Sequence, residues 1–405
     1  MRFVLGAEGE EARTLRSARG TWTVFVFMTA DEGHGVFTNN EIDTELSAIE
    51  HAINLHPGAR IVVQADRRDS KGLRCFVENG RFKREPLQKE PRSGDVDQIV
   101  EFLNFGRARH PSEHSLVLFW GHGFGPSGLF YESPPPLDPP KLRKALCRGF
   151  GLSGPVDIVG FMSCHMSTIE LAYELAEWRF PPLPITRAAN FVVASQGTVK
   201  PKQAFPYDEL FRTLLNAESS PIEVGKHLVD SLGTKYDAPF ALLDVSRSDA
   251  ARRALAALAS PLVAVNPFVV RHSTISGLRK DLHDALGEAK ADDEALLDLV
   301  RLGRKVAAIR STSTNESDGS SNQQARNAAK GLVETVEGSL VVHTGPRGTG
   351  ARELNGVSVY CPAHHGSDSL VEELISMDRY RELGLSKSVL GKCWIDVVRL
   401  ASEAH

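Results

Sequence analysis

The feature that most constrains the fold is a repeated pairing of a short apolar run with a helical pattern. Runs of strand length, rich in Val, Ile, Leu and Phe, occur at residues 22–28, 59–66, 116–123, 156–166 and 191–195. Helical patterns separate them, and residues 40–55 carry Ile42, Leu46, Ile49 and Ile53 on one helical face. Such alternation predicts an α/β protein with a mostly parallel sheet flanked by helices.

Two of these runs end on reactive side chains, His122 and Cys164. In a parallel sheet the carboxyl ends of the strands open into the same crevice, so the two side chains are expected to meet there. An imidazole beside a thiol is the minimum equipment of a cysteine nucleophile with a general base. The simpler interpretation of either residue alone is a buried cysteine and a histidine in a turn.

The chemistry assigns a role to each residue of this pair. A free thiol has a pKa near 8.5, and a neighbouring histidine favours its thiolate and later protonates the leaving amine. Gly123 lets the backbone approach a substrate closely, so its N–H and that of Cys164 are the expected oxyanion hole. His165 adjoins the cysteine, but alternation along a strand predicts that its ring points away from the crevice.

Composition excludes several other classes. The 405-residue chain has a net charge of −4, which gives no reason to expect nucleic acid as a partner, and no apolar run approaches the roughly 20 residues of a membrane span. The first 19 residues do not resemble a secretory signal. Five scattered cysteines form no disulfide framework, so we expect a cytoplasmic protein. His364 and His365 lack further ligands at a suitable spacing, so no metal site is predicted.

The second half of the chain has a different character. We expect residues 1–206 to form the catalytic core and residues 207–405 a helical extension packed on it, with a small β element of its own. Residues 292–308 show a helical pattern rich in Ala and Leu, whereas residues 311–324 are rich in Ser, Thr and Asn and are predicted to form a mobile loop.

Several of these segments, in this order, resemble the clostripain-like cysteine peptidases. The similar segments are residues 22–31, 119–123, 160–175, 194–196 and 205–208, with weaker similarity at 240–244 and 356–362. The resemblance implies a caspase-like fold, a His122/Cys164 dyad and endopeptidase activity. No cofactor is required by the residues themselves, and calcium is the one that the resemblance suggests.

Substrate preference is where the sequence departs from the resembled family. Those enzymes usually carry an aspartate two residues before the nucleophile, where this chain has Met162. Asp31 is expected to supply the charge for a basic substrate side chain, with Met162 and Ser195 also contributing to the substrate site. A loop-capping role for Asp31 is the alternative. Lys200 and Lys202 favour the opposite preference, for acidic side chains.

The segment between the two catalytic residues suggests regulation. It is rich in proline and then carries Lys141, Arg143, Lys144 and Arg148. Exposed proline-rich loops are readily cleaved, and in the resembled family a cut between the histidine and the cysteine accompanies activation. A processing segment and a solvated helix face are both consistent with this pattern.

Together these features predict a zymogen-forming cysteine endopeptidase that acts on protein substrates, after basic residues. The missing signal sequence favours an intracellular bacterial signalling or defence pathway with an upstream activating protein. The alternatives are a catalytically silent caspase-like scaffold and a protease with acidic specificity.

Overall fold

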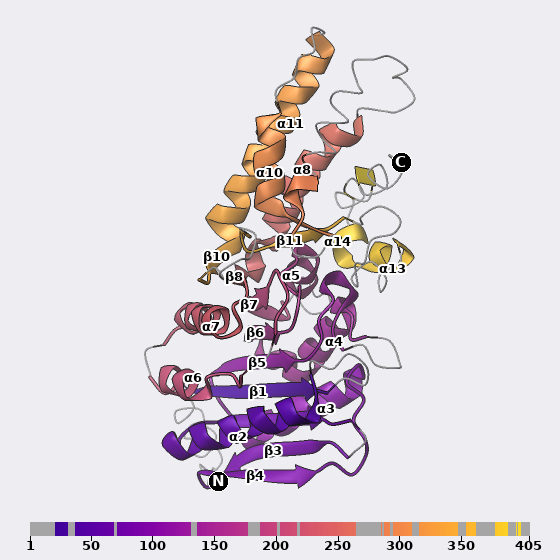
Figure 1. Ribbon diagram of the computed structural model, residues 1–405. Helices are drawn as coiled ribbons and strands as arrows, with labels where there is room; N and C mark the ends of the chain where they lie inside the picture. The colour runs from indigo at the N-terminus through magenta and orange to yellow at the C-terminus, as the bar shows by residue number, and fades with distance from the viewer. Residues whose placement is uncertain are drawn as a thin grey trace, which may run out of the picture.

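A nine-stranded sheet runs through the protein (Figure 1). The structure is a computed structural model that describes residues 21–30, 37–68, 71–130, 136–176, 187–200, 203–216, 219–264, 285, 287–291, 295–309, 316–346, 354–361, 377–387, 394 and 396–397. The strand order is β10-β8-β7-β6-β5-β1-β2-β3-β4. The strands are β1 (Trp22–Thr29), β2 (Ile61–Asp66), β3 (Leu73–Glu78), β4 (Arg81–Pro86), β5 (His114–Trp120), β6 (Val156–Met162), β7 (Ala189–Ser195), β8 (Phe240–Asp244) and β10 (Val341–Thr344).

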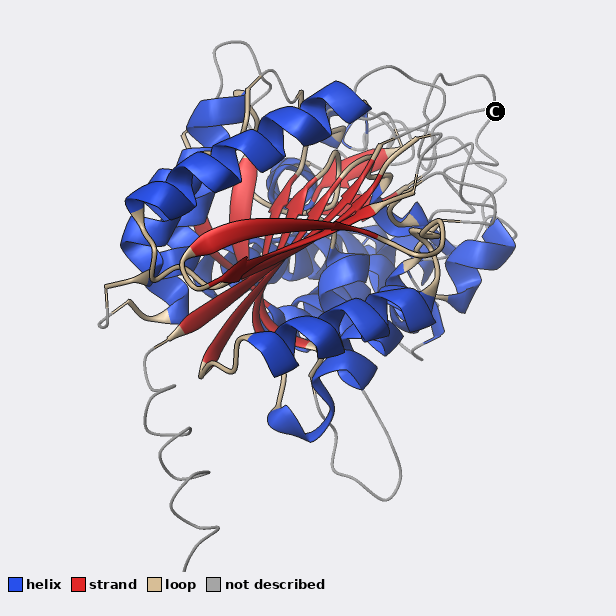
Figure 2. Cartoon of the chain, turned by 90° about the horizontal axis from the view of Figure 1, so that it is seen from below, coloured by secondary structure: helices blue, strands red, loops and turns tan. Residues whose placement is uncertain are grey.

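The middle of this sheet is parallel, as the sequence predicts. The pairs β2/β1, β1/β5, β5/β6 and β6/β7 are all parallel, whereas β3 and β4 on one side and β8 and β10 on the other pair antiparallel. Parallel strands need helices on both faces because both faces are buried. Figure 2 shows the twisted sheet between two layers of helices.

Alternate side chains of each central strand enter two separate apolar cores. In β1, Val24, Val26 and Met28 face one core, and Phe25 and Phe27 face the other. The first core is covered by α2 (Asn39–Leu55), α6 (Tyr207–Leu214) and α7 (Pro221–Tyr236). The second contains side chains of α3 (Val96–Arg109), α4 (Pro139–Phe150), α5 (Ile169–Ala176), α8 (Ser248–Ala264), α10 (Leu299–Ala308) and α11 (Glu316–Thr335).

Three of the core helices, α2, α3 and α4, begin where the sequence supplies a capping side chain. Thr38 and Glu41 form a capping box at the start of α2, and Asp95 accepts from the first-turn N–H groups of α3. Asp138 caps α4, whose first two residues are prolines. The predicted helix at residues 40–55 is therefore confirmed to within one residue.

The C-terminal part contributes to the central sheet as well as forming its own small one. β8 and β10 extend the main sheet past the predicted boundary at residue 206, while β9 (Leu296–Asp298) and β11 (Ser358–Tyr360) form a separate antiparallel pair. Two expectations were wrong. Residues 296–298 form a strand because β11 supplies its hydrogen bonds, and residues 316–324 are helical, within α11.

The remaining elements are short. They are the 3₁₀ turns η1 (Gly125–Ser127), η2 (Gly151–Ser153) and η3 (Val245–Arg247), the π-helical turn η4 (Val336–Leu340), and the helices α13 (Met377–Glu382) and α14 (Gly384–Lys387). Within the described ranges, no helix has the length and hydropathy of a membrane span.

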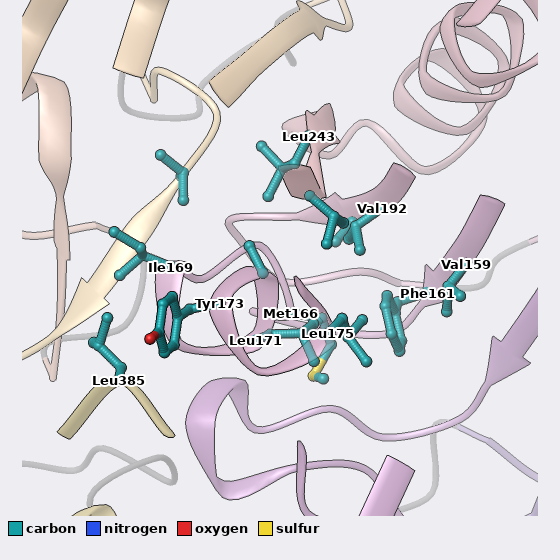
Figure 3. Packing of buried hydrophobic residues seen from close by; sticks show 14 of the residues in the cluster. Val159, Phe161, Met166, Ile169, Leu171, Tyr173, Leu175, Val192, Leu243 and Leu385 are labelled. Atoms are coloured by element: carbon teal, nitrogen blue, oxygen red, sulfur yellow. The ribbon is translucent and has the colours of Figure 1, made fainter. Parts of the chain in front are cut away.

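Helix α5 joins the core to the C-terminal part. Its apolar side chains lie in one cluster with Phe161 of β6, Val192 of β7 and Leu385 of α14 (Figure 3). Its two buried carboxylates also accept hydrogen bonds from the C-terminal part. Glu170 accepts from Tyr360 N and Tyr380 Oη, both at 2.8 Å, and Glu174 accepts from Gly384 N at 2.7 Å. Burial raises the pKa of Glu170 to about 7.

Candidate active site

The ends of β5 and β6 bring the two predicted catalytic residues to the same edge of the sheet. The last paired residues of these strands are Trp120 and Met162, which are partners in register. His122 and Cys164 each follow two residues later, so both leave the sheet at the same level. Both side chains are half-buried. The strands end before the reactive residues, which therefore lie in the connecting turns and not on the strands themselves.

Aromatic side chains hold the His122 ring. Phe37 meets it edge-on, with ring centroids 4.9 Å apart, and Phe124 stacks against it at 5.9 Å. Phe37 also packs edge-on against Trp120, with ring centroids 4.7 Å apart, so the segment that leads into α2 contacts the end of β5. The main-chain oxygen of His122 accepts from Phe130 N at 3.1 Å, so the turn that carries the ring is fixed as well.

Gly123 brings the histidine turn against the cysteine turn. A Cβ at this position would lie 2.5 Å from the Cys164 carbonyl oxygen, 2.8 Å from Ser163 Cβ and 2.9 Å from Met166 Cγ. Only glycine fits such a close approach of two backbones. Gly123 forms an isolated bridge with Leu129, whose hydrogen bonds come from the neighbouring N–H groups of Phe124 and Phe130. The Gly123 N–H therefore takes no part in the hydrogen bonds of this bridge. This is consistent with the oxyanion-hole hypothesis, in which that N–H donates to the substrate.

The Cys164 thiol contacts the loop that follows β7. Val199 N–H donates to Sγ at 3.2 Å, and Sγ lies 3.6 Å from the Val199 carbonyl oxygen. The side chain also packs at the edge of the core that contains Met162. No sequence pattern predicts the Val199 contact, because every residue other than proline has a backbone N–H.

His165 contacts this loop too, and the strand alternation used to predict its orientation does not apply to it. It has a left-handed backbone (φ 58°), donates its N–H to Gly197 O at 3.1 Å, and places Nδ1 3.4 Å from Gln196 O. The contact with Gln196, and not strand alternation, orients the ring, since β6 ends at Met162.

The predicted substrate residues lie in different surroundings. Met162 is 1% exposed within the apolar core. Ser195 is buried, and its hydroxyl donates to Gly197 O at 3.0 Å and accepts from Gly197 N at 3.1 Å. Lys200 is exposed. Asp31 and Lys202, like His364 and His365, lie outside the described residues. The roles of Asp31, Met162, Ser195 and the two lysines in substrate binding stay predictions.

The basic segment between the catalytic residues is helical. Lys141, Arg143, Lys144 and Arg148 all lie in α4. Arg143 pairs with the buried Glu174, and Arg148 pairs with Asp97 at 2.6 Å on the surface, while Lys144 is exposed. Leu142, Ala145 and Leu146 of the same helix are buried, so a cut within α4 requires the helix to unfold locally.

Calcium finds no ligand set in the part of the chain that the structure describes. There, no three His, Cys, Asp or Glu side chains are grouped as metal ligands would be. Calcium takes six to eight oxygen ligands, which include backbone and amide carbonyl oxygens as well as carboxylates, so its binding stays a prediction, and no step below involves a metal.

Comparisons with known proteins identify the fold and the family. The chain is similar in structure to an inactive zymogen C11 protease from Parabacteroides distasonis, at TM-score 0.60 and 15% identity, covering 91% of this chain and 98% of that one. It is similar also to a secreted C11 cysteine protease from Bacteroides thetaiotaomicron bound to an irreversible peptide inhibitor, at TM-score 0.56 and 16% identity, covering 92% and 99%.

At such identities these likenesses show the fold, which is the predicted caspase-like α/β fold. A comparison with curated proteins gave no match. The family model described as the clostripain family matches residues 26–373, which include β5, β6 and both of their reactive turns. The chain therefore belongs to the clostripain family of cysteine peptidases.

Proposed function

We propose that this cysteine protease cleaves peptide bonds with Cys164 as nucleophile and His122 as general base and acid. The observation that carries the proposal is the register of β5 and β6, which places the two residues at equivalent positions past the Trp120/Met162 pair. The Gly123 backbone, packed against the Cys164 carbonyl, supports the same assignment because it joins the two turns directly.

The reaction follows from these roles. Cys164 passes its proton to His122, and the thiolate attacks the carbonyl carbon of the scissile bond. The N–H groups of Gly123 and Cys164 stabilise the resulting oxyanion. His122 then protonates the leaving amine, and a thioester remains on Cys164. Water, deprotonated by His122, attacks the thioester, and the carboxylic acid leaves as the thiol regains its proton.

The test compares peptide hydrolysis by wild type, Cys164→Ala and His122→Ala. Activity is expected to vanish in the first variant and to fall by at least about 10²-fold in the second. Cys147→Ala and His343→Ala are the matched controls, because Cys147 is buried in the second core and His343 pairs with Asp230 far along the chain. Substantial activity in purified, folded Cys164→Ala would rule out the dyad.

The expected substrates have Arg or Lys before the cut, with Asp31 as the partner of the basic group. A substrate panel read against Asp31→Ala and Lys200→Ala tests this. Loss of Arg cleavage in Asp31→Ala supports the basic preference. A wild-type preference for Asp or Glu that is lost in Lys200→Ala supports the acidic alternative.

Activation is proposed to involve a cut between His122 and Cys164, made by the enzyme or by an upstream protease. A C11 relative of similar fold is described as an inactive zymogen, which supports this. Fragment masses of active preparations, compared with those of Cys164→Ala, identify the cut and show whether it is self-inflicted. A cytoplasmic location and a signalling or defence role remain predictions, which fractionation of the source cells would test.

A further inference from the structure

The last residue of β7 and the first residues after it are attached to the turn that carries Cys164. Ser195 O accepts from Ser167 N at 2.9 Å, Gly197 O accepts from His165 N at 3.1 Å, and Val199 N donates to Cys164 Sγ at 3.2 Å. Every second residue from Ser195 to Val199 is thus hydrogen-bonded to the turn that carries Cys164. We call residues 195–199 the thiol loop.

The side chain of Gln196 points away from the thiol, into the C-terminal part of the protein. It is fully buried, and its Nε2 donates to Asp298 Oδ2 at 3.1 Å and to Ser358 Oγ at 3.0 Å. Its Oε1 accepts from Gly356 N. The amide nitrogen thus donates two hydrogen bonds and the amide oxygen accepts one. These three bonds hold the side chain in one orientation.

These partners are themselves immobilised. Asp298, at the end of β9, caps α10 by accepting from Arg301 N at 2.8 Å, and it accepts from Asn355 N at 2.6 Å. Ser358 belongs to β11, whose pairing with β9 fixes both residues. Gly356 has φ +104°, a conformation that favours glycine. Gln196 is therefore anchored to a rigid pair of strands more than 100 residues away in sequence.

We propose that Gln196 is a positioning residue for the nucleophile, which holds the thiol loop so that the Val199 N–H stays on Cys164 Sγ and stabilises the thiolate. A hydrogen bond to a charged acceptor is about twice as strong as one to a neutral acceptor, so this donor favours the thiolate over the thiol. Val199 is 1% exposed, which keeps water from competing for the bond.

The inference rests on the proposed role of Cys164, but its test does not require activity. The rate of alkylation of Cys164 by iodoacetamide is measured against pH, by mass spectrometry of the peptide that carries it. Gln196→Ala is expected to move the midpoint of this profile upward by about one pH unit, which lowers alkylation below the midpoint about tenfold. kcat/KM should shift along the pH axis in the same direction.

Ser115→Ala is the matched control, because Ser115 is buried and accepts a hydrogen bond from Asp157 N at the opposite end of β5 and β6. It should leave the midpoint unchanged. Ser358→Ala removes only one partner of Gln196 and should give a smaller upward shift of the alkylation midpoint. This variant tests the inference if Gln196→Ala does not fold. An unchanged midpoint in a folded Gln196 or Ser358 variant overturns the inference, whereas an active Cys164→Ala would overturn the dyad instead.

Discussion

Replacing Gly123 by alanine is expected to damage both catalysis and stability. The new Cβ would lie 2.5 Å from the Cys164 carbonyl oxygen, and Cβ atoms essentially never approach other heavy atoms closer than 3.0 Å. The two turns must therefore separate by at least about 0.5 Å, the difference between these distances. A misplacement of 1 Å can cost roughly 10²-fold in rate, so we expect kcat/KM to fall about 10- to 100-fold. The stability cost of such overpacking is about 1–3 kcal/mol.

The measurement is kcat/KM on a peptide substrate together with the melting temperature. The matched control is Gly331→Ala in α11, where a Cβ meets nothing within 4 Å. That change should leave activity intact and stabilise the helix by about 0.5–1 kcal/mol. If folded Gly123→Ala kept the wild-type kcat/KM, the close contact of the two turns would not be what places the catalytic groups.

Two further predictions concern buried carboxylates. Arg143→Ala deprives the buried Glu174 of its guanidinium partner and should destabilise the protein by about 1–3 kcal/mol. Arg148→Ala removes an exposed ion pair and should cost under about 1 kcal/mol. Similar denaturation curves for the two variants would contradict this. Glu45 of α2 is buried and accepts from Phe205 N at 3.2 Å, and burial raises its pKa to about 7. The folded protein then holds a proton that the unfolded chain releases between pH 4.5 and 7, so stability falls as pH rises through that window, by about 3 kcal/mol in total. Glu45→Gln should remove this loss. If the melting temperatures of wild type and variant changed with pH in the same way from pH 4.5 to 8, the prediction would be refuted.

The sequence predicts the elements of the catalytic half well because local pattern and tertiary environment agree there. β1, β5 and β6 are continuous apolar runs, which is what a strand buried on both faces requires. β9 was missed because its three residues, Leu296 to Asp298, continue a helical pattern, and only pairing with β11 some 60 positions later makes them a strand. The first turns of α11 were missed because their Ser and Asn side chains show no apolar face.

The same contrast holds in the active site. His122 and Cys164 could be identified because each follows an apolar strand, and Gln196 follows β7 in the same way. The pattern was therefore present for Gln196, but its role depends on partners at Asp298 and Ser358 that no local signal announces. Phe37 and the Val199 N–H act through contacts that only the folded chain creates.

The distant anchor of Gln196 has a consequence for the order in which the protein is made. A ribosome completes β5, β6 and both reactive residues long before it reaches Asp298 and Ser358. A nascent chain of 200 residues thus carries the whole dyad but none of the groups that fix the amide of Gln196. Because these partners are translated so late, the thiol of a half-made protease is expected to react more slowly than that of the complete chain.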